Sequence, residues 1–218
     1  METIGRSRCY CIIAALYSLS GKKDTMTRIA FLTYIPRSGS TLLGKMLDSY
    51  RDVFVSLEAR IPAGIDARRF HAETRQELEH EIERLYADRK FANWDVPIKE
   101  LTAILDRRPL PMDFTDVLPL ILQEAARRRG KNPNVLIYKK ADYFVNAPYI
   151  DRLFPEARFL FVLRDPRAIY NSQKTSIHSV TGKPMVSNPF VFAHRYQRNY
   201  EFVRRRIRDA TFHVVRYE

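Results

Sequence analysis

The sequence predicts an α/β protein with three layers, in which helices cover both faces of a central parallel sheet. Apolar, partly β-branched runs of strand length alternate along the chain with amphipathic stretches of helical length, as in proteins built from parallel strands and crossover helices. The chain has 218 residues, of which 45% are hydrophobic, enough for one such domain with a sizeable core. We expect residues 26–218 to form this domain and residues 1–25 to be an N-terminal extension that need not belong to the fold.

The first half of the chain begins with its clearest strand, the apolar run at residues 29–35. A helix follows, and its expected buried stripe consists of Leu42, Leu43, Met46, Leu47 and Tyr50. Next come a short strand at residues 52–56 and an exposed amphipathic helix within the charged segment 71–90. A proline-bearing loop then leads to a helix at about 116–129, which the glycine after it ends.

The second half of the chain continues the alternation. Its three predicted strands lie at residues 134–138, 158–163 and 211–217. Three helices separate them: a short one through Ile150 and Leu153, one after Pro166, and one whose apolar face holds Ala193, Tyr196, Tyr200, Val203 and Ile207. A loop rich in Ser, Thr, Gly and Pro at residues 175–189 joins the last two helices.

The charge of the chain allows an anionic ligand but does not identify one. The formal net charge is +12, and such an excess suits phosphorylated ligands, nucleic acids or membrane surfaces. The arginine runs at 127–129 and 204–206 lie near predicted helix ends, where the helix dipole alone favours cations. No zinc-like cysteine pairs or RNA-recognition signatures accompany them, so we expect no nucleic-acid partner.

The N-terminal stretch and the cysteines indicate in which compartment of the cell the protein is expected. Cys9 and Cys11 are the only cysteines, which argues against a secreted fold built on disulfides. The apolar stretch from Cys9 to Leu19 is too short to span a bilayer comfortably, so we expect no stable membrane insertion. The stretch has the character of a weak signal peptide or of an upstream extension, and we expect a cytoplasmic protein.

The segment after the first strand partly matches a nucleotide-triphosphate P-loop. Gly39, Gly44 and Lys45 have the spacing G-x-x-x-x-G-K. The position after the lysine should be Ser or Thr, whose hydroxyl holds magnesium, but here it is Met46. The expected helix has also begun before Lys45, so the lysine lies a full turn inside it. The match to a P-loop kinase or NTPase is therefore poor, and we keep this class only as the alternative.

A different phosphate cradle fits the same segment better, and it makes the predicted fold P-loop-like. Pro36 to Thr41 turns the chain from strand to helix with a glycine and small hydroxyl residues. Free N–H groups and the dipole at a helix N-terminus favour an anion, and Arg37 adds a charged planar fork. The other interpretation is an ordinary turn that Ser38 or Ser40 caps.

Further polar residues follow other predicted strands. In parallel sheets ligands bind beyond the carboxyl ends of the strands, where we place Arg37 to Thr41, Lys139-Lys140 and Arg164-Asp165. Ser172 lies eight residues beyond Arg164, about two turns into the next helix. Each feature alone also fits a solvated side chain or a helix cap. Together they favour a large ligand with several negative charges.

These segments resemble the sulfotransferase family. Residues 36–42 resemble its 5′-phosphosulfate loop, and FPEARFLFVLRDPRAIYNS at 154–172 resembles its 3′-phosphate segment, in which an arginine and a later serine grip the phosphate. VVRYE at 214–218 resembles its late Tyr-Glu strand, whose tyrosine lies near the nucleotide. The resemblance implies 3′-phosphoadenosine 5′-phosphosulfate (PAPS) as the sulfuryl donor and no metal. The implied donor-binding residues are Arg37, Ser38, Gly39, Ser40, Thr41, Arg164, Ser172 and Tyr217.

Within the family, the chain looks most like the tyrosylprotein-sulfotransferase branch and its bacterial relatives. That branch has a Glu-x-Arg segment after the phosphosulfate loop, matched here by Glu58 and Arg60. The resemblance makes Glu58 the general base, with Arg37 and Lys139 as catalytic cations and Arg60 as an acceptor-binding residue. The branch's cysteine beside the glutamate is absent, and Gly64 stands where a further basic residue would help to hold an acidic peptide.

The resemblance therefore implies transfer of a sulfuryl group to a hydroxyl or amine acceptor, which is a small molecule, a glycan or a peptide. His178, His194 and His213 stay open as alternatives to Glu58, and an inactive anion-binding module stays open as a further function. The family normally continues beyond the Tyr-Glu strand, so we expect the domain to be incomplete at its C-terminus.

Overall fold

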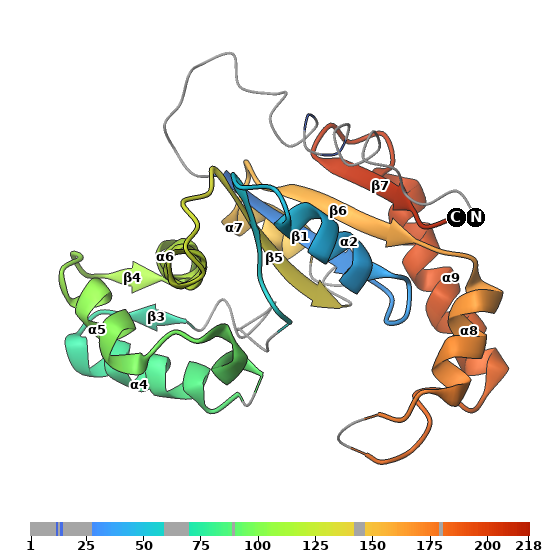
Figure 1. Cartoon of the computed structure of the whole chain (residues 1–218), viewed down its shortest axis with the longest axis horizontal. Helices are drawn as coiled ribbons and strands as arrows, with labels where there is room; N and C mark the ends of the chain where they lie inside the picture. The colour runs from blue at the N-terminus through green and yellow to red at the C-terminus, as the bar shows by residue number, and fades with distance from the viewer. Residues whose placement is uncertain are drawn as a thin grey trace.

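The protein is described by a computed structural model for residues 12, 14, 28–58, 70–88, 90–141, 147–178 and 181–218. Five parallel strands form the central sheet in the order β2-β5-β1-β6-β7, with β1 in the middle (Figure 1). Their bounds are Arg28–Tyr34 (β1), Val53–Val55 (β2), Val135–Ala141 (β5), Arg158–Leu163 (β6) and Phe212–Arg216 (β7). The predicted parallel α/β architecture is confirmed.

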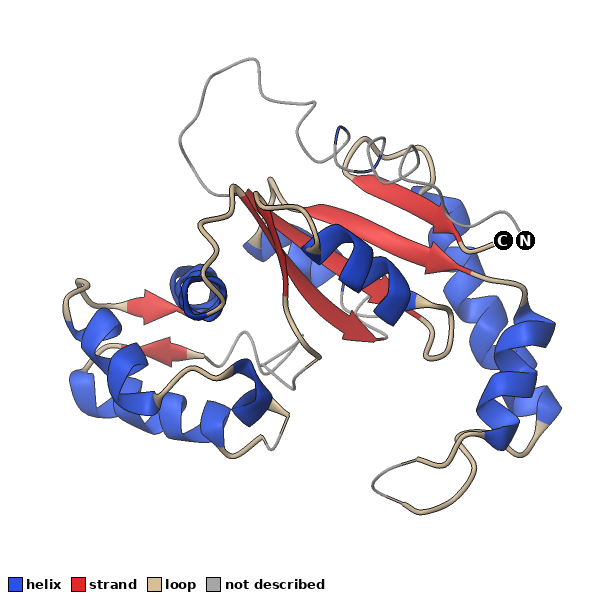
Figure 2. Cartoon of the chain, viewed as in Figure 1, coloured by secondary structure: helices blue, strands red, loops and turns tan. Residues whose placement is uncertain are grey.

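Helices lie on both faces of this sheet, as Figure 2 shows in blue against the red strands. The helices of the described residues, including two that lie beside the sheet, are Ser40–Asp48 (α2), Arg75–Tyr86 (α4), Ile98–Asp106 (α5), Phe114–Arg128 (α6), Ala147–Leu153 (α7), Pro166–Thr175 (α8) and Pro189–Arg206 (α9). A 3-10 helix, η1, covers Phe91–Trp94. Within the described residues, no helix has both the length and the apolar character needed to cross a bilayer.

Two clusters of buried side chains hold the layers together. On one face, Leu43 and Leu47 of α2 pack with residues of β1, β2, β5 and β6. Ile12 packs against this cluster, whereas the rest of the proposed extension lies almost entirely outside the described residues. On the other face, aromatic residues such as Phe31 and Phe159 pack with α6, α7 and α9. The alternation of side chains along each strand supplies both faces.

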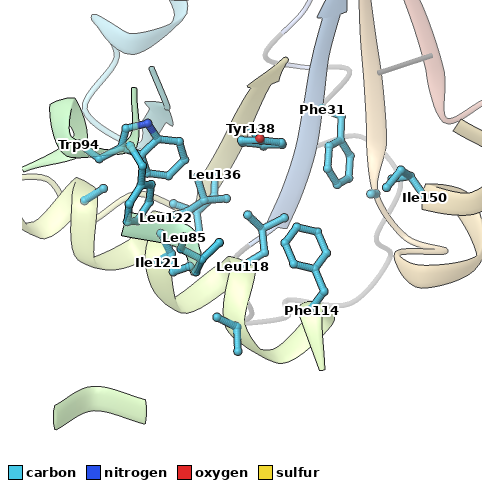
Figure 3. Packing of buried hydrophobic residues seen from close by; sticks show 14 of the residues in the cluster. Phe31, Leu85, Trp94, Phe114, Leu118, Ile121, Leu122, Leu136, Tyr138 and Ile150 are labelled. Carbon is cyan, nitrogen blue, oxygen red and sulfur yellow. The ribbon is translucent and has the colours of Figure 1, made fainter. Parts of the chain in front are cut away.

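A small lobe packs beside the sheet; its helix α4 lies within the segment 71–90 where the sequence predicted an amphipathic helix, but its other elements were not predicted. It consists of α4, η1, α5 and two short antiparallel strands, His71–Ala72 (β3) and Met112–Asp113 (β4). Trp94 joins it to the sheet, because its ring lies 6.1 Å from that of Tyr138 on β5 (Figure 3). Strands of two residues and a helix of nine leave too little periodicity to be recognised in a sequence.

Several expected details differ in the structure. Leu42 is 46% exposed, because the buried side of α2 is formed by Ser40, Leu43, Gly44 and Leu47. Of the predicted face of α9, Val203 is buried and Tyr196 is partly buried, as expected. Ala193, Tyr200 and Ile207 are exposed, and the other buried residues are Phe192 and Asn199, so that part of the prediction was wrong. Strand β5 continues to Ala141, which puts Lys139 inside the strand instead of after it.

Candidate active site

The turn between β1 and α2 has an unusual backbone for its sequence. The amide of Ser38 donates to the carbonyl of Ile35 at 3.1 Å, which closes a four-residue turn with Pro36 and Arg37 in the middle. Arg37 has φ of 75°, the sign that a type II turn needs at its third residue and that favours glycine or asparagine there. Non-glycine residues with positive φ are concentrated at functional sites, so this turn is the first candidate.

The N-terminus of α2 is open toward the same region. Its N-cap, Gly39, makes no side-chain cap hydrogen bond, and the first turn holds no acidic residue. By contrast, side chains of Thr74, Asp113, Asp165 and Asn188 cap α4, α6, α8 and α9. An ordinary turn capped by Ser38 or Ser40 is therefore not what the structure contains. Free N–H groups at such a terminus suit an anion.

The hydroxyl of Ser38 is a second feature that indicates an anion-binding site at this turn. Its side chain is fully buried, yet its hydroxyl oxygen has no hydrogen-bond partner. A buried hydroxyl without a partner costs about 1–3 kcal/mol, so such groups call for an explanation in a native structure. A phosphate or sulfate oxygen at the turn would satisfy it.

Residues from three other segments meet this turn. Nη1 of Arg164, just after β6, donates to the carbonyl of Arg37 at 2.8 Å. Nε of Arg37 donates to the hydroxyl of Ser172 on α8 at 2.9 Å. Tyr217 follows β7, and the guanidinium carbon of Arg164 lies 4.5 Å from the centre of its ring. The residues proposed to surround a 5′-phosphosulfate and a 3′-phosphate therefore form one contact network at the carboxyl edge of the sheet.

Two further residues that the sequence reasoning missed fix this network. Gln173, fully buried on α8, donates from Nε2 to the carbonyl of Pro36 at 2.8 Å and accepts from Arg195 at 2.9 Å. Oε1 of Glu218 lies 3.7 Å from Nε of Arg164, and the same oxygen accepts a hydrogen bond from the backbone amide of Asp165. The only local signal for Gln173 is its position directly after Ser172.

Asp165 has a separate role, as the cap of α8. It accepts from the backbone amide of Arg167 at 2.8 Å. Hydrogen bonds from the Arg167 side chain and backbone lower the pKa of Asp165 to about 2. The carboxylate therefore stays ionised at neutral pH and stabilises the helix start beside Arg164.

Lys139 and Glu58 lie on the other side of the turn. Nζ of Lys139 donates to the hydroxyl of Thr41 at 3.2 Å and lies 5.4 Å from the centre of the Tyr34 ring. Burial lowers the pKa of Lys139, whereas the Glu58 carboxylate opposes that shift and the ammonium of Lys90 adds to it. Glu58 is about one-third exposed, and its Oε2 is 3.8 Å from Nζ of Lys90. A carboxylate and two ammonium groups thus lie near one another, and the Lys139 ammonium contacts the first turn of α2.

The remaining predicted residues lie elsewhere or outside the described part. His178 is in the exposed loop after α8, and His194 is on the exposed side of α9. His213 lies on β7, where burial and the charge of Arg158 lower its pKa; Arg158 begins β6, at the opposite edge of the sheet from the turn. Arg60 lies outside the described residues.

The lysine of the P-loop pattern does not lie at this turn. Lys45 is exposed in the last turn of α2, far along the helix from the turn at Arg37. Within the described residues, no group of three or more His, Cys, Asp and Glu side chains is placed to hold a metal ion.

A comparison with known families shows to which family the chain belongs. The sequence profile described as "Sulfotransferase family" matches residues 30–218, which include all of the segments just described. The chain belongs to the sulfotransferase family. Its similarity to human protein-tyrosine sulfotransferase 1 is 25% identity over 155 residues, 71% of this chain and 34% of the relative.

Other relatives of this chain include a bacterial protein. Nodulation protein NoeE of Sinorhizobium fredii (strain NBRC 101917 / NGR234) is 30% identical over 159 residues, 73% of this chain and 33% of the relative. The aligned part is therefore about a third of the length of these curated relatives. Among solved structures, the sulfotransferase domain of the Synechococcus PCC 7002 olefin synthase matches with a TM-score of 0.51 and 16% identity, over 91% of this chain and 69% of that domain. This likeness supports the fold.

Gly39 offers a direct test of the geometry of the turn before α2. Its φ is 93°, and a Cβ built on it would collide with the ring of Tyr217. We expect Gly39→Ala to lower the free energy of unfolding by about 1–3 kcal/mol, because a left-handed backbone and a ring contact are both strained. Urea unfolding followed by circular dichroism measures this change.

Gly44→Ala is the matched control, since Gly44 lies inside the helix whose N-cap is Gly39. A Cβ there would meet Val55, Lys139 and Leu32 at 3.6–3.9 Å, ordinary contact distances, and alanine is the better helix former. We expect no loss of stability from this variant. Equal losses for the two alanine variants would show that the turn at Gly39 is not specially constrained.

Proposed function

We propose that this chain transfers a sulfuryl group from PAPS to a hydroxyl or amine acceptor by in-line attack. The observation that supports it most is the convergence of the uncapped α2 N-terminus with Arg164, Ser172 and Tyr217 on one strained turn. Membership of the sulfotransferase family supports the same reaction.

The residues of the turn fit such a donor. The buried Ser38 hydroxyl has no partner, and the residues from Gly39 to Thr41 would offer their N–H groups and hydroxyls to the 5′ end of the donor. Arg164 and Ser172 would hold the 3′-phosphate, with Tyr217 beside the nucleotide. Arg37 is hydrogen-bonded to both Arg164 and Ser172, so it would lie between the 5′ and the 3′ phosphate sites. When bound, the donor supplies the activated sulfuryl group and a phosphate leaving group.

The protein's own contribution is to position the reactants and to stabilise negative charge, as in phosphoryl transfer. Arg37 and Lys139 would neutralise the charge that spreads over the transferring group and the leaving phosphate. The low-dielectric surroundings of the half-buried Lys139 would strengthen its effect. Glu58 would accept the proton of the acceptor, and Arg60 would contact the acceptor. The acceptor itself stays open among small molecules, glycans and peptides.

Nucleotide binding without metal is the experiment that tests this function. We expect adenosine 3′,5′-bisphosphate to bind in calorimetry with the same affinity in EDTA and in magnesium, because Arg37 and Lys139 already supply cationic charge. ATP should bind more weakly under both conditions, since it lacks the 3′-phosphate. Tight ATP binding that requires magnesium would instead support the kinase or NTPase alternative.

A further inference from the structure

Lys90 lies beside Glu58 although many residues of the small lobe separate the two in sequence. Its Nζ is 3.8 Å from Oε2 of Glu58, and the two side chains are 53% and 31% exposed. Within the described part of the chain, Lys90 is the only cation in an ion pair with Glu58. Lys139 lies close enough for both charges to affect its pKa, in opposite directions. Glu58 therefore has the ammonium groups of Lys90 and Lys139 near it, and its ion pair is with Lys90, the more exposed of the two.

The backbone of Lys90 is held in place by the lobe. Its amide donates to Oδ1 of Asp88 at 2.8 Å, directly after α4. The next residue, Phe91, is buried, and its ring lies 5.3 Å from that of Trp94. Trp94 in turn packs on Tyr138, as Figure 3 shows, and Tyr138 directly precedes Lys139. The turn that carries Lys90 is thus packed onto the strand that carries Lys139.

The chain that leads to Glu58 is also attached to β5. The amide of Ser56 donates to the carbonyl of Ile137 at 2.9 Å. Its hydroxyl accepts from the amide of Lys139 at 3.0 Å. Glu58 follows two residues later, so the positions of the carboxylate and of both lysines are defined against one strand.

We propose that Lys90 is a positioning residue that holds the Glu58 carboxylate away from the Lys139 ammonium. The inference rests on the proposed function, in which Glu58 must face the acceptor and Lys139 must face the donor. Lys139 is the more buried lysine, so a direct pair with Glu58 would be less screened by water than the pair with Lys90. Such a direct pair would neutralise the Lys139 ammonium beside Thr41. It would also hold the Glu58 carboxylate in an ion pair, where it could not accept the acceptor's proton.

Binding of adenosine 3′,5′-bisphosphate measures this effect without any acceptor. We expect Lys90→Met to weaken binding about fivefold at low salt, the factor for one unit charge at about 4 Å in water, because Glu58 then moves onto Lys139. Glu58→Gln in the same chain should restore the affinity, since an amide cannot pair with Lys139. Lys90→Arg should bind like the wild type. Lys99→Met removes an exposed lysine from α5 of the same lobe. It is the control for the loss of one positive charge from the lobe at a position that is not paired with Glu58.

The outcomes separate this inference from the proposed function. Wild-type affinity in Lys90→Met would overturn the role of Lys90 alone. A loss that Glu58→Gln does not reverse, or an equal loss in Lys99→Met, would also overturn it, because both point to a structural or general charge effect. If the wild-type chain does not bind the bisphosphate, the proposed function and this inference both fall. Added salt should reduce the difference between Lys90→Met and the wild type.

Discussion

Replacing Glu58 by glutamine is expected to slow sulfuryl transfer by about two or more orders of magnitude while nucleotide affinity barely changes. Glutamine keeps the shape of the side chain but cannot accept the acceptor's proton, and general base catalysis typically contributes about 10²–10⁴-fold. The carboxylate is only about one-third exposed and is paired with Lys90, whereas Lys139 contacts Thr41 at the donor-binding turn. Single-turnover transfer, with an acceptor found by screening phenols, glycans and tyrosine peptides, measures the rate.

Glu79→Gln provides the control, because it removes an exposed carboxylate from α4 of the neighbouring lobe. We expect its transfer rate to equal that of the wild type. A near-normal rate in Glu58→Gln would move the base to another residue, with His178 and His194 the first to be replaced. Lost nucleotide binding in Glu58→Gln would instead mark Glu58 as a structural residue.

The sheet and the donor-binding segments were predictable because their signals are local. Strands β1 and β6 are short and mostly apolar. Arg164 and Asp165 follow β6 at once, and Arg37 and Ser38 follow β1 after Ile35 and Pro36. In a parallel sheet the residues after neighbouring strands meet at one edge, so the order of strands and polar residues along the chain was enough to place Arg37 near Arg164. Their 2.8 Å contact agrees with that placement.

The acceptor side could not be predicted in the same way. The contact between Lys90 and Glu58 depends on how the small lobe folds onto β5, through Phe91, Trp94 and Tyr138. No spacing in the sequence records such a long-range packing. Gln173 was missed for a related reason, since only the tertiary structure shows that its amide reaches the carbonyl of Pro36.

The incorrect face of α9 has a different cause. The helix carries aromatic and apolar residues on more than one side, and Phe190 and Val191 are 83% and 61% exposed. Counting apolar residues at helical spacing therefore selected a stripe that includes the exposed Tyr200. The side that is buried contains Asn199, a polar residue that no count of apolar positions would include.

Arg164→Ala is expected to reduce the affinity for adenosine 3′,5′-bisphosphate by about 10- to 100-fold more than the affinity for adenosine 5′-phosphate. A charged hydrogen bond contributes about 1.5–3 kcal/mol, and a guanidinium holds phosphate oxygens with two donors at once. The 3′-phosphate distinguishes the two ligands. Arg164 also donates to the carbonyl of Arg37 and stacks on Tyr217, so both ligands should lose some affinity through the loosened turn.

The ratio of the two losses isolates the contribution of the 3′-phosphate from this structural effect. Arg167→Ala is the matched control: Arg167 lies three residues later, its side chain is 88% exposed, and it pairs with Asp165. Calorimetric titration of both variants with both ligands gives the ratio, and we expect it to stay at the wild-type value in Arg167→Ala. Equal losses for the two ligands in Arg164→Ala would mean that Arg164 supports the turn without binding the 3′-phosphate. That phosphate would then have to be held by Arg37 and Ser172, whose side chains already contact each other at 2.9 Å.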